Sequence, residues 1–195
     1  NAISESSVEL NKRFPELDYV FSPEVTFITA NELYEKYPNL SAEERERTFV
    51  KEHGTTFIIG IGNKLPNGTV HSMRAPDYDD YSTMDEKTGL AGLNGDLLIW
   101  YPVLERSIEL SSMGIRVNRE ALERQLRESG KEERKALYFH RRLIDGSLPQ
   151  SIGGGIGQSR ICMFFLRKAH IGEVQSSLWP NEIVAECERL GITLL

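Results

Sequence analysis

The chain has 195 residues, of which 39% are hydrophobic and 27% are charged, a composition typical of a globular domain with a substantial core. The formal net charge of -6 argues against general nucleic-acid binding, which requires a basic surface, although a single nucleotide needs only a few local cations. No apolar run reaches the length of a membrane-spanning helix. Cys162 and Cys187 have neither metal-ligand nor disulfide spacing, so we expect reduced thiols in a cytoplasmic protein.

The first part of the chain predicts short helices and strands in alternation. Ser41 and Glu44 have the spacing of a capping box, which predicts a charged helix that begins after Ser41 and ends near Gly54. The other expected elements are helices over 3–14 and 31–37, strands over 25–28 and 55–61, and a turn at 66–68.

The second part of the chain begins with an irregular, acidic loop over 74–95, and long loops of this kind tend to be functional. Asn118 can cap a helix. The irregular order of strands and helices favours an α+β fold, a mostly antiparallel sheet flanked by helices, in a single domain of residues 1–195. The expected elements are strands over 96–101 and 107–117, helices over 118–129, 132–145 and 159–167, a glycine-rich strand before the last of these, and a final helix after Pro180.

Glycines stand at every second position in the stretch that holds Gly153, Gly155 and Gly157. Alternate residues of a strand share a face, so a strand here would have a face without side chains, against which a flat ligand such as a purine can lie. Arg160 would stand at the edge of this platform, where it can stack on a base or bind phosphate. A glycine-rich turn at a tight crossing is the alternative, because neither the dinucleotide-binding nor the phosphate-loop spacing is present.

Asp96 and Glu109 form a second candidate site. If the hairpin turns at Pro102 and Val103, the two acids face each other across the strands, and a magnesium ion that also binds phosphate would relieve their repulsion. The alternative is a turn elsewhere with both acids solvated, and the two residues alone favour that alternative.

The loop over 74–83 concentrates three carboxylates, with two tyrosines between and after them. Such a cluster can bind an ammonium group, although a solvated acidic loop is the commoner meaning of such a run. The three carboxylates belong to Asp77, Asp79 and Asp80. The histidines do not cluster, and we expect surface or packing roles for His53, His71, His140 and His170.

Taken together, these stretches resemble ammonia-dependent asparagine synthetase, the aspartate–ammonia ligase whose catalytic fold is that of class II aminoacyl-tRNA synthetases. The resemblance covers nearly the whole chain. It is strongest over residues 74–83, 92–96, 109–116 and 149–160, and it extends to 170–175 and 179–180.

The resemblance implies roles for individual residues. The third class II motif, Gly-x-Gly-x-Gly-x-x-Arg, falls on 153–160 and places the glycines under adenosine and Arg160 against adenine and the ATP phosphates. Aspartyl- and asparaginyl-tRNA synthetases place a metal-binding Asp and Glu before a Ser/Gly pair and an arginine. This pattern is similar to Asp96, Glu109, Ser111, Ser112 and Arg116 here, which implies Mg²⁺ at the two acids. Leu110 lies in the same nucleotide-binding stretch, and Arg116 is expected at the adenylate. For the aspartate and ammonium groups the expected residues are Asp79, Asp77, Arg74 and Ser111. Among the acids Asp79 is preferred over Asp77 and Asp80.

Two departures from the synthetases favour a small-molecule ligase. Ser159 replaces the usual acidic residue before the motif arginine, and no segment resembles an anticodon-binding barrel.

The first and second class II motifs, which precede the matched region in the family, are not found in this sequence. We therefore expect the C-terminal portion of a catalytic domain that is incomplete at its N-terminus, from an enzyme that is a homodimer when full-length.

The expected reaction is activation of the aspartate side chain by ATP to β-aspartyl-AMP and pyrophosphate, followed by attack of ammonia to give asparagine and AMP. Cys162 lies in an apolar helical run and is a poor nucleophile for glutamine hydrolysis, so ammonia is the expected nitrogen donor. Neither nucleic acid nor a membrane is an expected partner. The alternatives are a catalytic fragment of an aspartyl- or asparaginyl-tRNA synthetase and a non-catalytic nucleotide-binding paralogue.

Overall fold

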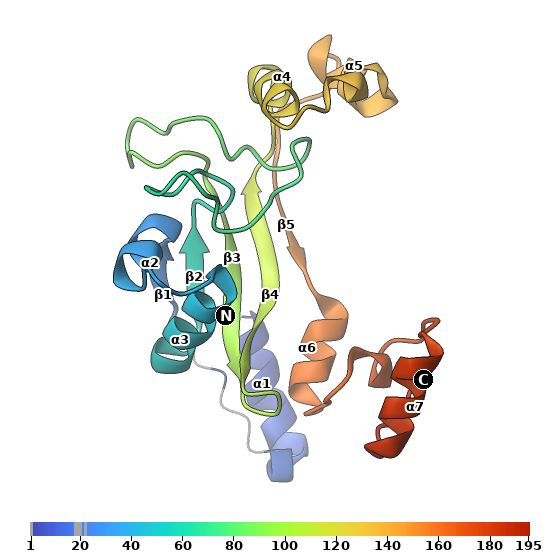
Figure 1. Ribbon diagram of the computed structural model, residues 1–195. Coiled ribbons are helices and arrows are strands. Elements are labelled where there is room, and N and C mark those ends of the chain that lie inside the picture. Colours follow the sequence, from blue (N-terminus) through green and yellow to red (C-terminus); the bar gives the residue numbers. More distant parts are fainter. Residues whose placement is uncertain (1, 18–20, 22) are drawn as a thin grey trace.

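A five-stranded mixed sheet forms the centre of the computed structural model, which describes residues 2–17, 21 and 23–195 (Figure 1). The strands lie in chain order, with β1 and β2 parallel and each later pair antiparallel. The predicted α+β fold with a mostly antiparallel sheet is therefore confirmed. The strands are β1 (Thr26–Thr29), β2 (Thr56–Ile59), β3 (Asn94–Tyr101), β4 (Arg106–Ile115) and β5 (Ile152–Ile156).

Two helices begin where the predicted caps stand. The Ser41 side chain accepts a hydrogen bond from the Glu44 N–H, and Asn118 accepts one from the Ala121 N–H at 2.8 Å. The α-helices are α1 (Ala2–Arg13), α2 (Ala30–Lys36), α3 (Ala42–His53), α4 (Arg119–Glu128), α5 (Tyr138–Ile144), α6 (Gln158–Phe165) and α7 (Asn181–Arg189). Short 3₁₀ helices are η1 (Pro15–Leu17), η2 (Glu132–Ala136) and η3 (Ile171–Glu173).

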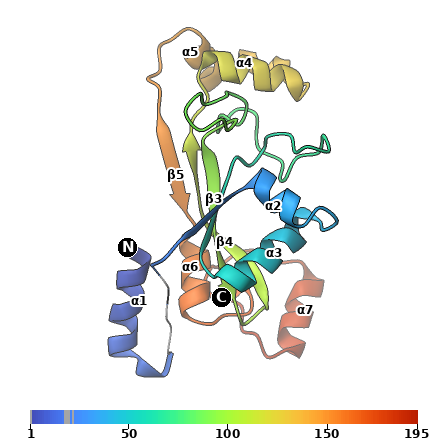
Figure 2. The same cartoon turned by 90° about the vertical axis from the view of Figure 1, so that its left-hand side faces the viewer.

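Two hydrophobic clusters cover the two faces of the sheet. Neighbouring residues of a strand point to opposite faces. Accordingly Leu98 packs with α2 and α3, whereas Ile99 packs with α1 and α6. Figure 2 shows α2 and α3 on one side of the sheet and α1 on the other. The face that carries Leu98 is called the α3 face below, and α4 and α5 lie beyond its upper end in Figure 1.

The direct opposition of Asp96 and Glu109, which depended on a turn at Pro102 and Val103, is wrong. The turn spans the four residues 102–105 rather than two, so Tyr101 pairs with Arg106. A β-bulge then shifts the register further, and Asp96 pairs with Ser112 instead of Glu109. Turn length and the bulge together therefore move the two acids out of direct opposition.

The single helix predicted over 132–145 is also wrong, because Leu137 has an extended backbone (φ -70°, ψ 154°) that separates η2 from α5. Arg134 and His140 both contact Asp77, at 2.9 and 3.0 Å. Residues six apart on one continuous α-helix point about 120° apart around its axis, so the break lets both side chains face the same carboxylate.

Both cysteines are free thiols. Among the described residues, no helix combines the length and the apolar character needed to cross a bilayer.

Candidate functional site

Asp96, Ser112 and Gly155 form a row across β3, β4 and β5 on the α3 face. Asp96 pairs with Ser112 and Ser112 with Gly155, and residues paired directly across strands share a face. Arg74 joins the first two, because its guanidinium donates to the Asp96 carboxylate at 2.5 Å and to the Ser112 hydroxyl at 3.0 Å. The acidic loop thus contributes its one arginine to the middle of the sheet.

The β-bulge brings Glu109 to this same face. Glu109 pairs with Leu98, whose side chain lies on the α3 face, although Glu109 is three residues before Ser112 and would otherwise point to the opposite side. Asp96 and Glu109 are therefore diagonal neighbours on adjacent strands, a relation that places Cα atoms roughly 7–8 Å apart. The face shared by the two acids, predicted from a wrong register, is retained through the bulge.

Gly153 and Gly155 lie in strand β5, as expected, whereas Gly157 is the N-cap residue of α6, and the three glycines have different surroundings. Where a Cβ of Gly155 would lie, no other heavy atom of the described residues comes within 4 Å. A Cβ on Gly153 would lie 2.7 Å from Nη2 of Arg116, and one on Gly157 would lie 3.4 Å from the Arg160 side chain. The side-chain-free platform is thus one open position, Gly155, between two positions covered by arginines.

Arg160 extends along the lower end of this platform. Its Nη1 donates to the Glu109 carbonyl at 3.0 Å and lies 3.5 Å from the Glu109 carboxylate. The Arg160 side chain is 47% exposed, so the pair is weakly held and the guanidinium can reorient toward a ligand.

Asp79 is almost fully buried, at 2% exposure, and forms an ion pair with Arg116. Gly114 makes this burial possible, because a Cβ there would lie 3.1 Å from the Asp79 carboxyl. The Arg116 guanidinium also lies over the Tyr78 ring, 3.9 Å from its centroid. Asp79 and Arg116 form the upper boundary of the candidate site, next to Gly153.

The other two acids of the loop have structural contacts of their own. Asp80 accepts hydrogen bonds at 2.9 Å from the backbone N–H groups of residues 82 and 83, which is a local turn. Asp77 binds Arg134 and His140. Burial raises the pKa of the Asp77 carboxyl, but the hydrogen bonds from Arg134 and His140 and the charge of Arg134 outweigh burial, so this pKa lies below its ordinary value.

Ser111 and Leu110 lie away from the α3 face. Ser111 is adjacent to Ser112 in the strand and therefore points to the opposite side, where its hydroxyl donates to the Gly155 carbonyl at 2.8 Å. Leu110 is 1% exposed in the core, and its carbonyl accepts from the Gly157 N–H at 2.8 Å. Both residues hold β4 and β5 together beneath the candidate site.

Four polar residues that hold the acidic loop were not predicted from sequence. Gln125 of α4 binds residues 76–82 of the loop, Arg124 binds residues 82 and 83, and Arg134 and His140 bind Asp77. Gln125 left a signal, because it stands at helical spacing among the buried residues Ala121, Leu122 and Leu126.

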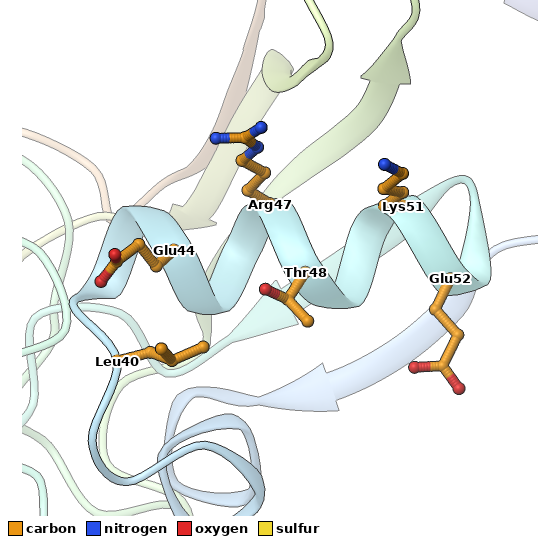
Figure 3. Close-up of a pocket in the computed structure, with 6 residues that line it drawn as sticks. All are labelled: Leu40, Glu44, Arg47, Thr48, Lys51 and Glu52. Carbon is orange, nitrogen blue, oxygen red and sulfur yellow. The ribbon is translucent and has the colours of Figure 1, made fainter.

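A separate hollow lies along the exposed side of α3 (Figure 3). Figure 3 shows Arg47 and Lys51 on one side of this helix and Glu52 on the other. None of the residues predicted for the site lines this hollow. It is therefore distinct from the row that centres on Ser112.

The family model for aspartate–ammonia ligase matches residues 1–191. Aspartate–ammonia ligase of Bacteroides thetaiotaomicron is 57% identical over 182 residues, which are 93% of this chain and 52% of that protein. The ligase of Clostridium tetani is 50% identical over 194 residues, 100% of this chain and 54% of that protein. The chain thus spans about half the length of the curated relatives that it matches.

Solved structures share the fold at low sequence identity. The asparaginyl-tRNA synthetase of Entamoeba histolytica superposes with a TM-score of 0.62 at 18% identity, covering 89% of this chain and 41% of that one. The Pyrococcus horikoshii asparaginyl-tRNA synthetase gives 0.59 at 17% identity, covering 92% and 46%. The expected synthetase-like fold is confirmed. Together with the match over residues 1–191, these findings show that the chain belongs to the aspartate–ammonia ligase family.

Proposed function

We propose that the full-length protein uses ATP to amidate L-aspartate with ammonia through a β-aspartyl-AMP intermediate, and releases AMP, pyrophosphate and asparagine. The observation that carries this proposal is the open position at Gly155, which lies between Arg116 and Arg160 on the face that also carries Asp96 and Glu109. A flat base fits against bare backbone, and two guanidinium groups beside it suit the phosphates.

Charge handling is the main demand of the proposed reaction. When a carboxylate attacks a polyphosphate, two anions approach each other, so catalysis rests on positioning and on cations around the phosphates. We assign Arg160 to adenine and the phosphates and Arg116 to the adenylate. Arg160 is half-exposed and weakly paired, whereas Arg116 is held by Asp79, so the first is free to follow the ligand and the second is fixed.

Asp96 and Glu109 are the proposed Mg²⁺ ligands. Their carboxylates supply the hard oxygen donors that Mg²⁺ prefers, and both lie on the face where the phosphates would bind. Bound Mg²⁺ would neutralise phosphate charge at that position. Arg74 and Arg160 provide the positive partners of these acids in the structure, and both are long enough to turn toward anionic ligands.

Asp79 is the proposed partner of the substrate amino group or of ammonium. Its carboxylate is close to Arg116, whereas Asp77 is bound to two side chains outside the platform. A buried carboxylate can attract ammonium and accept the proton that ammonium loses before it attacks. Arg74 and Ser112 are the proposed partners of the aspartate carboxylates, and their hydrogen bond at the centre of the row supports this assignment.

The first test is a tRNA-free assay of the full-length protein with ATP, Mg²⁺, aspartate and ammonium, in which AMP and asparagine are measured together. We expect the two products in equal amounts. Aspartate-dependent pyrophosphate exchange without asparagine would instead indicate a synthetase. Absence of turnover with retained ATP binding would indicate a nucleotide-binding paralogue.

A further inference from the structure

Gln125 of α4 is fully buried, and its side-chain amide binds the acidic loop. Its Nε2 donates to the carbonyls of Pro76 and Asp79 at 3.0 and 3.1 Å. Its Oε1 accepts from the Tyr81 N–H at 2.9 Å and from the Ser82 hydroxyl at 2.8 Å. One side chain thus fixes the loop on both sides of Asp79.

These four bonds use the complete hydrogen-bonding capacity of a primary amide, which has two N–H donors and one oxygen with two lone pairs. A glutamate at this position could still accept from the loop but could not donate to both carbonyls. A leucine of similar size could do neither. The requirement for two donors and two acceptors within one buried side chain is therefore specific to glutamine here.

Arg124, the preceding residue of α4, binds the same loop from the outside. Its Nη2 donates to the Ser82 and Thr83 hydroxyls at 3.0 and 2.7 Å. On the sheet side, the Asp80 N–H donates to the Ile115 carbonyl at 2.9 Å. The loop is thus held between α4 and the end of β4, with the Asp79 carboxylate directed at Arg116.

We infer that Gln125 is a positioning residue, which holds the backbone of the loop so that Asp79 stays paired with Arg116 at the upper end of the ligand platform. The four bonds of Gln125 all go to the loop, so it acts on the platform through the loop. The expected effect of Gln125 on catalysis rests on the proposed function, because that effect assumes that Asp79 binds the amino group or ammonium. The fixing of the loop by α4 does not depend on the proposed function.

The test uses full-length protein with Gln125→Glu and Gln125→Leu, and with Gln175→Glu as a control that makes the same chemical change at an exposed residue. We expect kcat/KM for aspartate or ammonium to fall about 10- to 100-fold in both Gln125 variants, a size typical of a reacting group misplaced by about 1 Å. The KM for ATP should change less than the KM for aspartate or ammonium, because Gln125 does not contact Gly155 or Arg160 and reaches Arg116 only through Asp79. The control should keep wild-type kinetics.

The pH profile separates positioning from general loss of packing. Burial raises the pKa of a carboxyl group, and the side chain introduced by Gln125→Glu regains one donor when it is protonated. This variant should therefore recover activity relative to wild type as the pH falls, whereas Gln125→Leu should not. Equal pH profiles for the two variants, with unchanged KM for aspartate and ammonium, would overturn the inference.

Amide hydrogen exchange distinguishes failure of this inference from failure of the proposed function. Residues 76–82 should exchange faster in both Gln125 variants than in wild type, with β3 and β4 unchanged, whether or not the protein makes asparagine. If wild type makes no asparagine but this exchange pattern is found, the proposed function fails and the positioning role stands. Unchanged exchange over 76–82 would contradict the positioning role itself.

Discussion

The absent side chain of Gly153 makes room for the guanidinium of Arg116. A Cβ at residue 153 would lie 2.7 Å from Nη2 and 2.9 Å from Nε of Arg116, closer than nonbonded heavy atoms approach. The same guanidinium is paired with Asp79 and stacked on Tyr78. The glycine therefore sets where the positive charge stands beside the platform, in addition to leaving a bare backbone.

The Gly153→Ala variant should displace Arg116 and keep the fold, because the group it meets is the end of a flexible side chain. We expect the catalytic efficiency for aspartate to fall about tenfold or more through misplacement of this charge. Steady-state kinetics on the full-length enzyme measure the effect, and Ile156→Ala, an exposed residue of the opposite face of β5, serves as the control. Wild-type kinetics in Gly153→Ala would show that the position of Arg116 does not matter.

The Gly155→Val variant tests the open position. Because no heavy atom of the described residues, apart from the two chain neighbours, lies within 4 Å of where a Cβ of Gly155 would be, the new side chain should leave the melting temperature close to that of wild type. It should nevertheless block a base from the platform, so the Kd for ATP should rise by about tenfold or more in isothermal titration calorimetry. Unchanged ATP binding in a folded variant would place the nucleotide elsewhere.

Ser111→Ala should mainly lower stability, whereas Ser112→Ala should mainly alter kinetics. Removing the Ser111 hydroxyl leaves the Gly155 carbonyl without its 2.8 Å bond, which should lower the free energy of unfolding by about 0.5–1.5 kcal/mol. Removing the Ser112 hydroxyl frees Arg74 from one contact on the α3 face, so it should alter kinetics more than stability. Urea denaturation and steady-state assays of both variants measure the contrast, and the reverse pattern would contradict the assigned faces.

Local signals predicted most of the elements, because a cap or turn depends on residues close in sequence. Ser41 with Glu44, and Asn118, mark helix starts that the structure confirms. The break at Leu137 had no such signal, since it depends on contacts of Arg134 and His140 with Asp77, far away in the sequence. His140 was accordingly expected on the surface or in packing, and its hydrogen bond to Asp77 was not predicted.

The geometry of the site depends on the turn length, the β-bulge and the position of Arg116, which the sequence does not show. Turn length and the bulge at Leu110 decide the register of β3 against β4, and neither follows from the residues of the hairpin alone. Gly155 and Gly153 could be predicted to share a face, but not that Arg116 would cover one of them. The pattern of residues thus indicates the ligand class, whereas the order of charges along the platform needs the fold.

The Asp79→Asn variant should abolish asparagine formation in the full-length enzyme while the fold persists. The amide retains the size of the carboxylate but lacks its charge, so it can neither attract ammonium nor accept a proton. Circular dichroism and an ATP-binding assay provide the controls, since Gly155 and Arg160 are untouched. Turnover at the wild-type rate would remove Asp79 from the proposed chemistry.

The Asp77→Asn variant tests the anchor between the loop and α5 through its pH dependence. Because the pKa of Asp77 is lower in the folded state than its ordinary value, its charge stabilises the fold above the unfolded pKa of about 3.9, and this contribution is lost as pH falls through the folded pKa. The variant should therefore be less stable than wild type by about 1–3 kcal/mol at neutral pH, the range for removing one partner of a buried polar contact. The difference should shrink below about pH 4, as wild-type Asp77 becomes protonated. Denaturation curves of both proteins from neutral pH down to about pH 3 measure it, and a gap that stays constant over that range would exclude the ionised Asp77 as its source.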